Sequence, residues 1–337
     1  MTRTTQTGRT YNQLHVPRRY TPGRRRVSVY WTWSYPWEAN QDVTVLDNRL
    51  STMTEVRRVA WPAYETLEYS AKMFQQGIAG TLELFHLSLV RFQELAGEIT
   101  GHPVAVYQRV DQAGQRLPLD ERVLADTDTL LVFGLDSMVT EQEASPDEIE
   151  ALREFSKREG SCLLLGPHHD VGASPDFRVR AMEHAHHGDP LVPSQQRFAL
   201  YVRSLMKALG VPVENRWGLH PATEDGTKLR PLTIARDLDT RGWLEGVTTG
   251  NFHPHLPHYA VTTDDASAIR VLARQPIDLS HPHPFTEAGN RELNLFLWMP
   301  PSGARGGDIV LADSTLFTTL FGRDASLERF WENLVTR

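Results

Sequence analysis

The sequence predicts an α/β fold in which a doubly wound, mostly parallel sheet is covered by helices on both faces. Seven short apolar runs have the length of buried strands, and their apolar residues are uninterrupted rather than alternating. Helical segments lie between the early runs, and this alternation is typical of a parallel sheet. The predicted strands cover residues 27–31, 104–107, 129–134, 162–166, 269–273, 293–298 and 308–312.

The helices between these strands are predicted from periodicity and from capping residues. Residues 61–75 and 80–98 carry apolar side chains at helical spacing. A third helix is predicted to begin at Ser145, where Glu148 completes a capping box, and to end at Gly160. Two more helices are predicted over residues 194–209 and 326–335.

We expect the 337 residues to form a basic N-terminal arm, residues 1–26, and one α/β domain, residues 27–337. Seven arginines and no acidic residue precede Glu38, so the arm is expected to dock on a neighbouring subunit of a homo- or hetero-oligomer. Residues 211–290, approximately, are rich in proline, glycine and histidine. We interpret them as a loop-rich insertion that helps to build a site.

The composition excludes several classes of protein. A net charge of −7 argues against a nucleic-acid partner, and no apolar run is long enough to span a membrane. The single cysteine, Cys162, excludes an internal disulfide framework and cysteine-rich metal sites. These features predict a cytoplasmic protein whose partners are a small-molecule substrate and other subunits.

The 14 histidines are concentrated in a few short segments. Two of them, His168 and His169, lie in the turn after the predicted strand 162–166, and side chains at such strand ends face the ligand crevice of a doubly wound fold. Neutral imidazoles with a carboxylate are the usual ligands of a catalytic zinc ion, although the spacing here matches no diagnostic motif. We expect these residues to bind a divalent metal ion, with zinc favoured over iron and manganese. Its candidate ligands are His168, His169, His184, His187, His253 and His255.

Other residues at predicted strand ends complete this expected site. Asp136 and Asp170 are the candidate catalytic carboxylates that would accept a proton. Asp313 is expected to cap the helix that follows it. The aromatic residues after the first strand would either wall a substrate pocket or anchor a subunit interface. These candidate substrate-binding residues are Trp31, Trp33, Tyr35 and Trp37.

The order of elements and two short segments resemble the class I glutamine amidotransferase-like superfamily, whose fold is flavodoxin-like. That superfamily carries a G-x-C-x-G turn, where this chain has GPHHD at residues 166–170, so that His168 stands in the place of the cysteine. The NFHPHL segment at residues 251–256 is similar to the superfamily's F-H-P-E segment, with His255 in the place of the glutamate. Residues 293–317 resemble the branch of trehalose-utilisation proteins and gliding-type ABC-transporter accessory subunits, which usually lack the cysteine.

The missing cysteine excludes a glutaminase reaction through a thioester. We expect instead a metal-dependent, zinc-type hydrolase of a small, aromatic or otherwise activated substrate, in a converted amidotransferase-type pocket. Two alternatives stay open. The first is a non-catalytic or regulatory subunit of a heteromeric enzyme or transporter complex. The second, which the resemblance implies, is a sugar-binding domain like those of trehalose-utilisation proteins.

Overall fold

The computed structural model describes residues 20–32, 77–109, 117–136, 138, 141–186, 197–250, 255–319 and 325–337, without the side chains of residues 77–88. Most of the predicted basic arm and the predicted helix 61–75 lie outside the described residues. No helix in the described ranges is both long and apolar enough to cross a bilayer.

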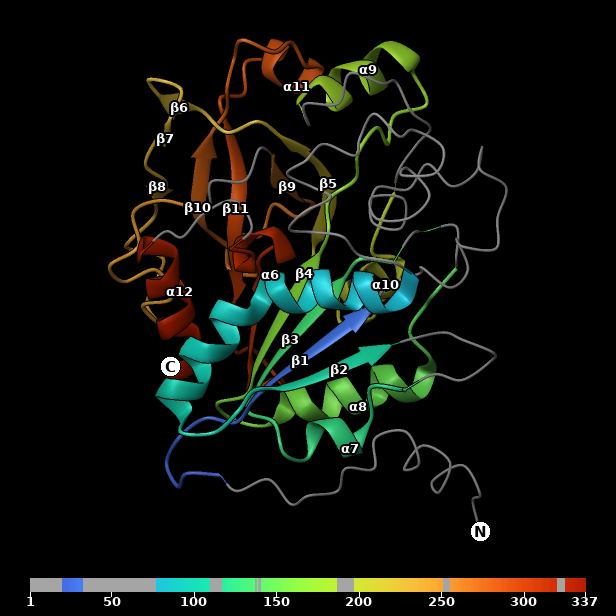
Figure 1. Ribbon diagram of the computed structural model, residues 1–337, viewed down its shortest axis with the longest axis vertical. Helices are drawn as coiled ribbons and strands as arrows, with labels where there is room; N and C mark the ends of the chain where they lie inside the picture. Colours follow the sequence, from blue (N-terminus) through green and yellow to red (C-terminus); the bar gives the residue numbers. More distant parts are fainter. Residues whose placement is uncertain are drawn as a thin grey trace.

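An eight-stranded sheet forms the centre of the molecule (Figure 1). Its five parallel strands have the order β2-β1-β3-β4-β12, the 2-1-3-4-5 order of flavodoxin-like folds, so the predicted fold class is confirmed. Three antiparallel strands, β11, β10 and β8, extend the sheet beyond β12. The strands are β1 (Val27–Thr32), β2 (Ala105–Arg109), β3 (Thr129–Gly134), β4 (Cys162–Pro167), β8 (Thr233–Ile234), β10 (Arg270–Pro276), β11 (Glu292–Met299) and β12 (Asp308–Leu311).

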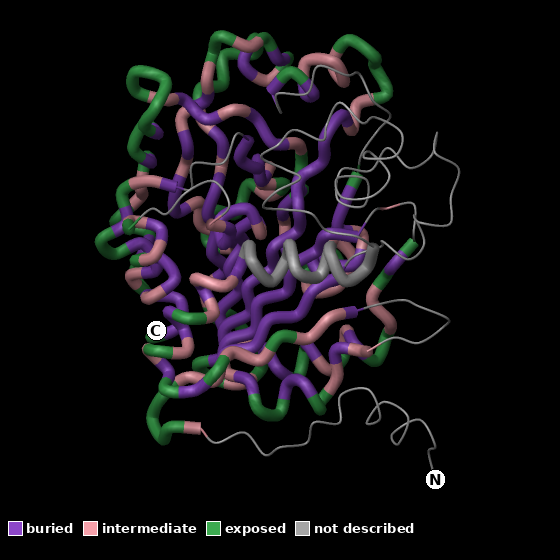
Figure 2. The backbone as a smooth tube through the Cα atoms, viewed as in Figure 1, coloured by how far each residue is buried: buried purple, intermediate pink, exposed green. Residues whose placement is uncertain are grey.

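Helices cover both faces of this sheet because successive strand residues point to opposite sides and both sides are apolar. On β3, Leu131 and Phe133 belong to one buried cluster, and Leu130 and Val132 belong to the other. The central strands are accordingly buried along their whole length (Figure 2). The first face is covered by α6 (Gly77–Thr100) and α12 (Ala325–Thr336), and the second by α7 (Glu121–Leu124), α8 (Pro146–Lys157) and α10 (Leu200–Ala208).

The region of residues 211–290 contains more regular structure than its composition predicts. It supplies β8 and β10 to the main sheet and forms two separate antiparallel pairs. Helix α9 (Phe177–His186) and α11 (Pro284–Glu287) lie side by side at the top of the molecule in Figure 1. The two pairs are β5 (Val213–Leu219) with β9 (Leu256–Val261), and β6 (Thr223–Glu224) with β7 (Lys228–Leu229).

The predicted start of α8 is confirmed, whereas α10 begins later than its sequence pattern predicts. Ser145 and Glu148 form the reciprocal capping box at the start of α8. Helix α10 begins only at Leu200, because Ala199 has a left-handed backbone with φ of 64°. Ala199 has no side chain that can cap the helix. The Asp136 carboxylate, which follows β3, accepts the Tyr201 N–H instead, at 3.2 Å.

A buried ion pair joins the end of β2 to the start of α8. The Arg109 guanidinium contacts the Glu148 carboxylate, and both side chains are 2% exposed. Glu148 Oε1 also accepts the backbone N–H of Leu119 at 3.0 Å and the Tyr201 hydroxyl at 3.0 Å. Burial, the largest single influence, raises the pKa of Glu148, but the charge of Arg109 and the hydrogen bonds that the carboxylate accepts together outweigh it and lower the pKa below its usual value.

We predict that Glu148→Ala destabilises the fold by about 3 kcal/mol or more, because it leaves the Arg109 charge buried without its partner. Urea denaturation of the variant and of the unmodified protein measures this difference. Glu154→Ala is the matched control, since Glu154 lies on the exposed side of the same helix and forms its ion pair with the exposed Lys157. Equal denaturation midpoints for both variants would show that the buried pair does not stabilise the fold.

Candidate metal centre and adjoining cavity

Two neighbouring parallel strands bring the central polar residues together. Strands β4 and β12 are paired in register through Leu165 and Leu311, so the residues that follow them emerge at the same edge of the sheet. His168 and His169 come directly after β4, and Asp313 comes two residues after β12. This is the carboxyl edge of the parallel strands, where ligand sites of doubly wound folds lie.

The Asp313 carboxylate is fully buried and holds both histidines. Its Oδ2 accepts the backbone N–H of His169 and lies 3.0 Å from Nδ1 of the same residue. Its Oδ1 lies 3.5 Å from His168 Nδ1 and accepts the Thr315 N–H at 2.8 Å, which caps the short 3₁₀ helix Ser314–Phe317. Burial would raise the pKa of Asp313, but the two imidazoles outweigh it and hold the pKa well below its usual value.

His255, which precedes β9, extends this group by a further imidazole. His255 Nδ1 lies 2.6 Å from His169 Nε2, so the two nitrogens share one proton in a hydrogen bond. The contact depends on a close approach of β5, because a Cβ at Gly218 would lie 2.4 Å from His169 Cδ2. Of the two predicted ligands in the NFHPHL segment, His255 therefore joins the group, and His253 lies outside the described residues.

The geometry of His168, His169 and Asp313 suits a metal ion. One ligand atom from each of the three lies within 4.8 Å of the others, and all three residues are buried. His168 Nδ1 is buried and makes no hydrogen bond with the described residues. Two ligand atoms that each lie about 2.1 Å from a tetrahedral metal ion are about 3.4 Å from one another. The distance between His168 Nδ1 and Asp313 Oδ1 is similar, at 3.5 Å.

The two carboxylates predicted to be catalytic hold the backbone around this group. Asp170 Oδ1 accepts from the Phe198 N–H at 3.0 Å and from Arg203 at 2.7 Å, and Arg197 lies 3.5 Å from Oδ2. Asp136 accepts from the Thr32 hydroxyl at 2.6 Å and from the Tyr201 N–H. Burial raises the pKa of both carboxyls, and these partners oppose it.

The remaining predicted site residues lie apart from the group of three or outside the described ranges. His184 lies on α9 and packs against Gly172, where a Cβ would lie 2.4 Å from His184 Nε2. Trp31 is buried in the core, with its ring centroid 5.6 Å from that of Phe133. The residues outside the described ranges are His187, His253, Trp33, Tyr35 and Trp37.

Three other buried histidines have a different chemical state. His186, His258 and His283 each accept a backbone N–H at Nδ1, at 3.0–3.2 Å. A neutral imidazole that accepts at Nδ1 carries its proton on Nε2, so neither nitrogen offers a lone pair to a metal. Burial is the main cause that lowers the pKa of His186 and of His258 to about 4; neighbouring histidines and, at His258, the charge of Arg216 contribute further.

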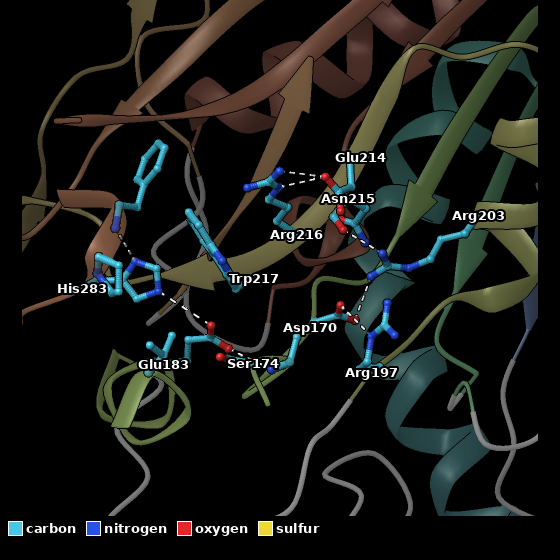
Figure 3. A pocket seen from close by; sticks show the side chains of 14 residues that line it. Asp170, Ser174, Glu183, Arg197, Arg203, Glu214, Asn215, Arg216, Trp217 and His283 are labelled. Atoms are coloured by element: carbon cyan, nitrogen blue, oxygen red, sulfur yellow. Dashed lines mark hydrogen bonds and ion pairs between the residues drawn. The ribbon is translucent and has the colours of Figure 1, made fainter. Parts of the chain in front are cut away.

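A cavity of about 610 Å³ lies beside the candidate metal centre, between α9, β5 and α11 (Figure 3). The histidines of the centre do not line it, but the two regions share a wall. Asp170, which follows His169, lines the cavity, and Asn215 of the cavity wall donates to the backbone oxygen of His168 at 2.8 Å. Figure 3 shows Trp217 of β5 between His283 on one side and Asn215 on the other.

The sequence patterns do not assign Asp313 to the site, nor the residues that line the cavity, with the exception of Asp170. Asp313 was expected only as a helix cap, a role that the structure confirms. Its second role depends on the pairing of β12 with β4, which no local pattern shows. Trp217, Asn215 and His283 come from β5 and from the N-cap of α11, inside the region interpreted as loops.

Comparisons with known proteins do not assign the chain to a family. No protein-family model matches the sequence, and no curated protein matches it. Among solved structures, a protein described as ThuA-like from Bacteroides uniformis ATCC 8492 is similar at 9% sequence identity with a TM-score of 0.40. The alignment covers 94% of this chain and 92% of that one.

We predict that the stability of the protein falls as the pH decreases from about 6.5 to about 4, in part because of His258. Its pKa is about 4 in the folded chain and 6.5 in the reference state, so the unfolded chain binds more protons in this interval. The contribution is complete above pH 6.5 and is lost as the pH falls toward 4. Urea denaturation at several pH values measures it.

His258→Gln is the test variant, because a glutamine oxygen can still accept the Asn294 N–H that His258 accepts. We expect its stability to fall less steeply between pH 6.5 and 4, by up to about 1.4 kcal/mol per pH unit. Parallel curves for the two proteins would show that His258 does not titrate on unfolding.

Proposed function

We propose that the protein is a metal-dependent hydrolase whose metal ion is held by His168, His169 and Asp313. The observation that carries this proposal is the burial of two imidazoles and one carboxylate with their ligand atoms within 4.8 Å of one another. Two nitrogen ligands and one oxygen ligand are a common set for catalytic zinc and leave a fourth position for water or substrate. A bound zinc ion would supply Lewis acidity and a water of lowered pKa.

The residues around this group support the ligands in their places. With His169 bound through Nδ1, its ring proton lies on Nε2 and is donated to His255 Nδ1, at the observed 2.6 Å. A partner of this kind fixes the tautomer and the orientation of a ligating imidazole. The His169 backbone N–H stays on Asp313 Oδ2, so the carboxylate keeps its orientation. His255 is therefore a positioning residue in this proposal.

Asp136 and Asp170 take a supporting part in the proposal. Each accepts a backbone N–H from the segment at the start of α10, and Asp170 is also bound by arginine. These contacts hold the start of α10 against the ends of β3 and β4. His168 and His169 directly follow β4. The alternatives of a regulatory subunit and of a sugar-binding domain stay predictions.

The first test is the metal content of protein purified without a histidine tag. We expect about one zinc, iron or manganese ion per chain, measured by elemental mass spectrometry, and at least ten-fold less in His168→Ala and in Asp313→Asn. His102→Gln is the control, because His102 lies between α6 and β2, at the opposite edge of the sheet. Metal-free protein that takes up no zinc from solution, or full occupancy in Asp313→Asn, would contradict the proposal.

The second test concerns His255. We predict that His255→Phe weakens zinc binding by about 10–100-fold without abolishing it, because the variant removes the partner of His169 Nε2 but none of the three ligands. Competition with a chelating dye measures the affinity. His255→Gln, which offers an acceptor oxygen, should recover part of the loss. Unchanged affinity in His255→Phe would exclude a positioning role.

A further inference from the structure

The cavity between α9, β5 and α11 has an apolar side and a charged side. On the apolar side Trp217, Phe285 and Val179 line the cavity, and each of them is partly exposed. The charged side lies around Asp170, where Figure 3 shows two arginines on the far side of Asp170 from Trp217. A ligand in this cavity therefore meets apolar surface and charge at different places.

The two arginines on the charged side share one carboxylate. Arg203 Nη2 lies 2.7 Å from Asp170 Oδ1, and its other N–H groups donate to the backbone oxygens of Phe198 and Asn215. The shortest contact of Arg197 with the carboxylate is 3.5 Å, from Nε to Oδ2, which is longer than a normal hydrogen bond. Because one carboxylate balances one guanidinium, the charge of Arg197 is in surplus on this side.

The surplus charge is also the one that a ligand can reach. The Arg197 side chain is 48% exposed, whereas that of Asp170 is 4% exposed. The two other carboxylates of the wall have partners elsewhere. Glu183 is 1% exposed and accepts a backbone N–H at 2.9 Å, and Glu214 lies 2.8 Å from Arg216. The formal charges of the wall balance, but the accessible charge around Asp170 is positive.

The apolar side offers aromatic surface to a ligand. The Trp217 and Phe285 rings pack edge to face, with centroids 5.0 Å apart at an angle of 61°. One face of the indole is stacked on His258, which holds the ring in place. Partly exposed aromatic rings lose water favourably when another ring packs beside them. A volume of about 610 Å³ has room for a small molecule that reaches both sides.

We propose that this cavity binds a small aromatic monocarboxylate. The carboxylate pairs with the Arg197 guanidinium, whose planar fork can offer two parallel N–H groups, and the ring packs beside Trp217 and Phe285. One surplus positive charge matches a single negative charge better than the nearly double charge of a phosphate monoester. The histidines of the candidate metal centre do not line the cavity, so the binding does not require the metal ion.

The probe is 4-phenylbutyrate, whose flexible chain lets the carboxylate and the ring reach different sides of the cavity. Its matched control is 4-phenylbutyramide, which has the same shape without the charge. Titrations followed by NMR use unmodified protein freed of metal by EDTA and dialysed, so that the acid has no metal ion to bind. We expect the acid to bind about ten-fold more tightly than the amide, and about ten-fold more tightly than acetate, which lacks the ring. Salt at about 0.5 M should weaken binding of the acid but not of the amide.

Three variants locate the binding. Arg197→Gln should remove the preference for the acid over the amide, because it removes the surplus charge. Arg178→Gln is the matched control and should keep the preference, since Arg178 is exposed on α9 and does not line the cavity. Trp217→Leu should weaken binding of the acid and of the amide by a similar factor.

The comparison of acid and amide uses the unmodified chain, so it does not depend on whether a variant folds. Because the protein is free of metal, its outcome is also independent of the proposed metal centre. Equal binding of acid and amide, no binding of the acid at millimolar concentration, or tighter binding of phenyl phosphate than of the acid would overturn the proposal. An undiminished preference for the acid in Arg197→Gln would do the same.

Discussion

The buried carboxylate of Asp313 is the group on which the candidate site depends. It lies where β12 ends beside β4, and it contacts both histidines that follow β4. A carboxylate without exposure to water is stable only when its oxygens are paired, so the histidines and Asp313 hold one another in place. The same carboxylate starts the short helix Ser314–Phe317. One group thus connects the sheet, the helix that follows it and the candidate metal ligands.

Acidic residues at other strand ends have a related structural role. Asp136 after β3 and Asp170 after β4 each accept a backbone N–H near the start of α10, from Tyr201 and Phe198. Helix α10 has no capping side chain of its own, because Ala199 is at its N-cap. The Asp136 carboxylate therefore pairs an N–H group in the first turn of the helix, and Asp170 holds the residue that precedes the N-cap. The two acids at the carboxyl edge of the sheet thus have their oxygens occupied, Asp136 by the Thr32 hydroxyl and a backbone donor and Asp170 by a backbone donor and arginine.

The buried histidines divide into two groups according to the partner of Nδ1. His168 and His169 face a carboxylate through Nδ1, and a metal ion can replace the proton between such groups. His186, His258 and His283 accept backbone N–H groups there, which places the ring proton on Nε2. A high local density of histidines therefore does not by itself predict which of them can bind a metal ion, nor where in the fold they lie. His283 of the second group is one of the residues that line the cavity beside the candidate metal centre.

The sequence by itself determined the seven strands, the capping box of α8 and the doubly wound order, because buried strands and helix caps are local patterns of apolar and capping residues. It also placed His168, His169 and Asp170 at a strand end. Only the tertiary structure decided that Asp313 and His255 join His169. Asp313 lies 144 residues from His169 along the chain, and His255 lies 86 residues from it. The same holds for the cavity, where Asn215, Trp217 and His283 meet through the packing of β5 against α11. Periodicity describes which face of an element is buried, but not which element lies against it.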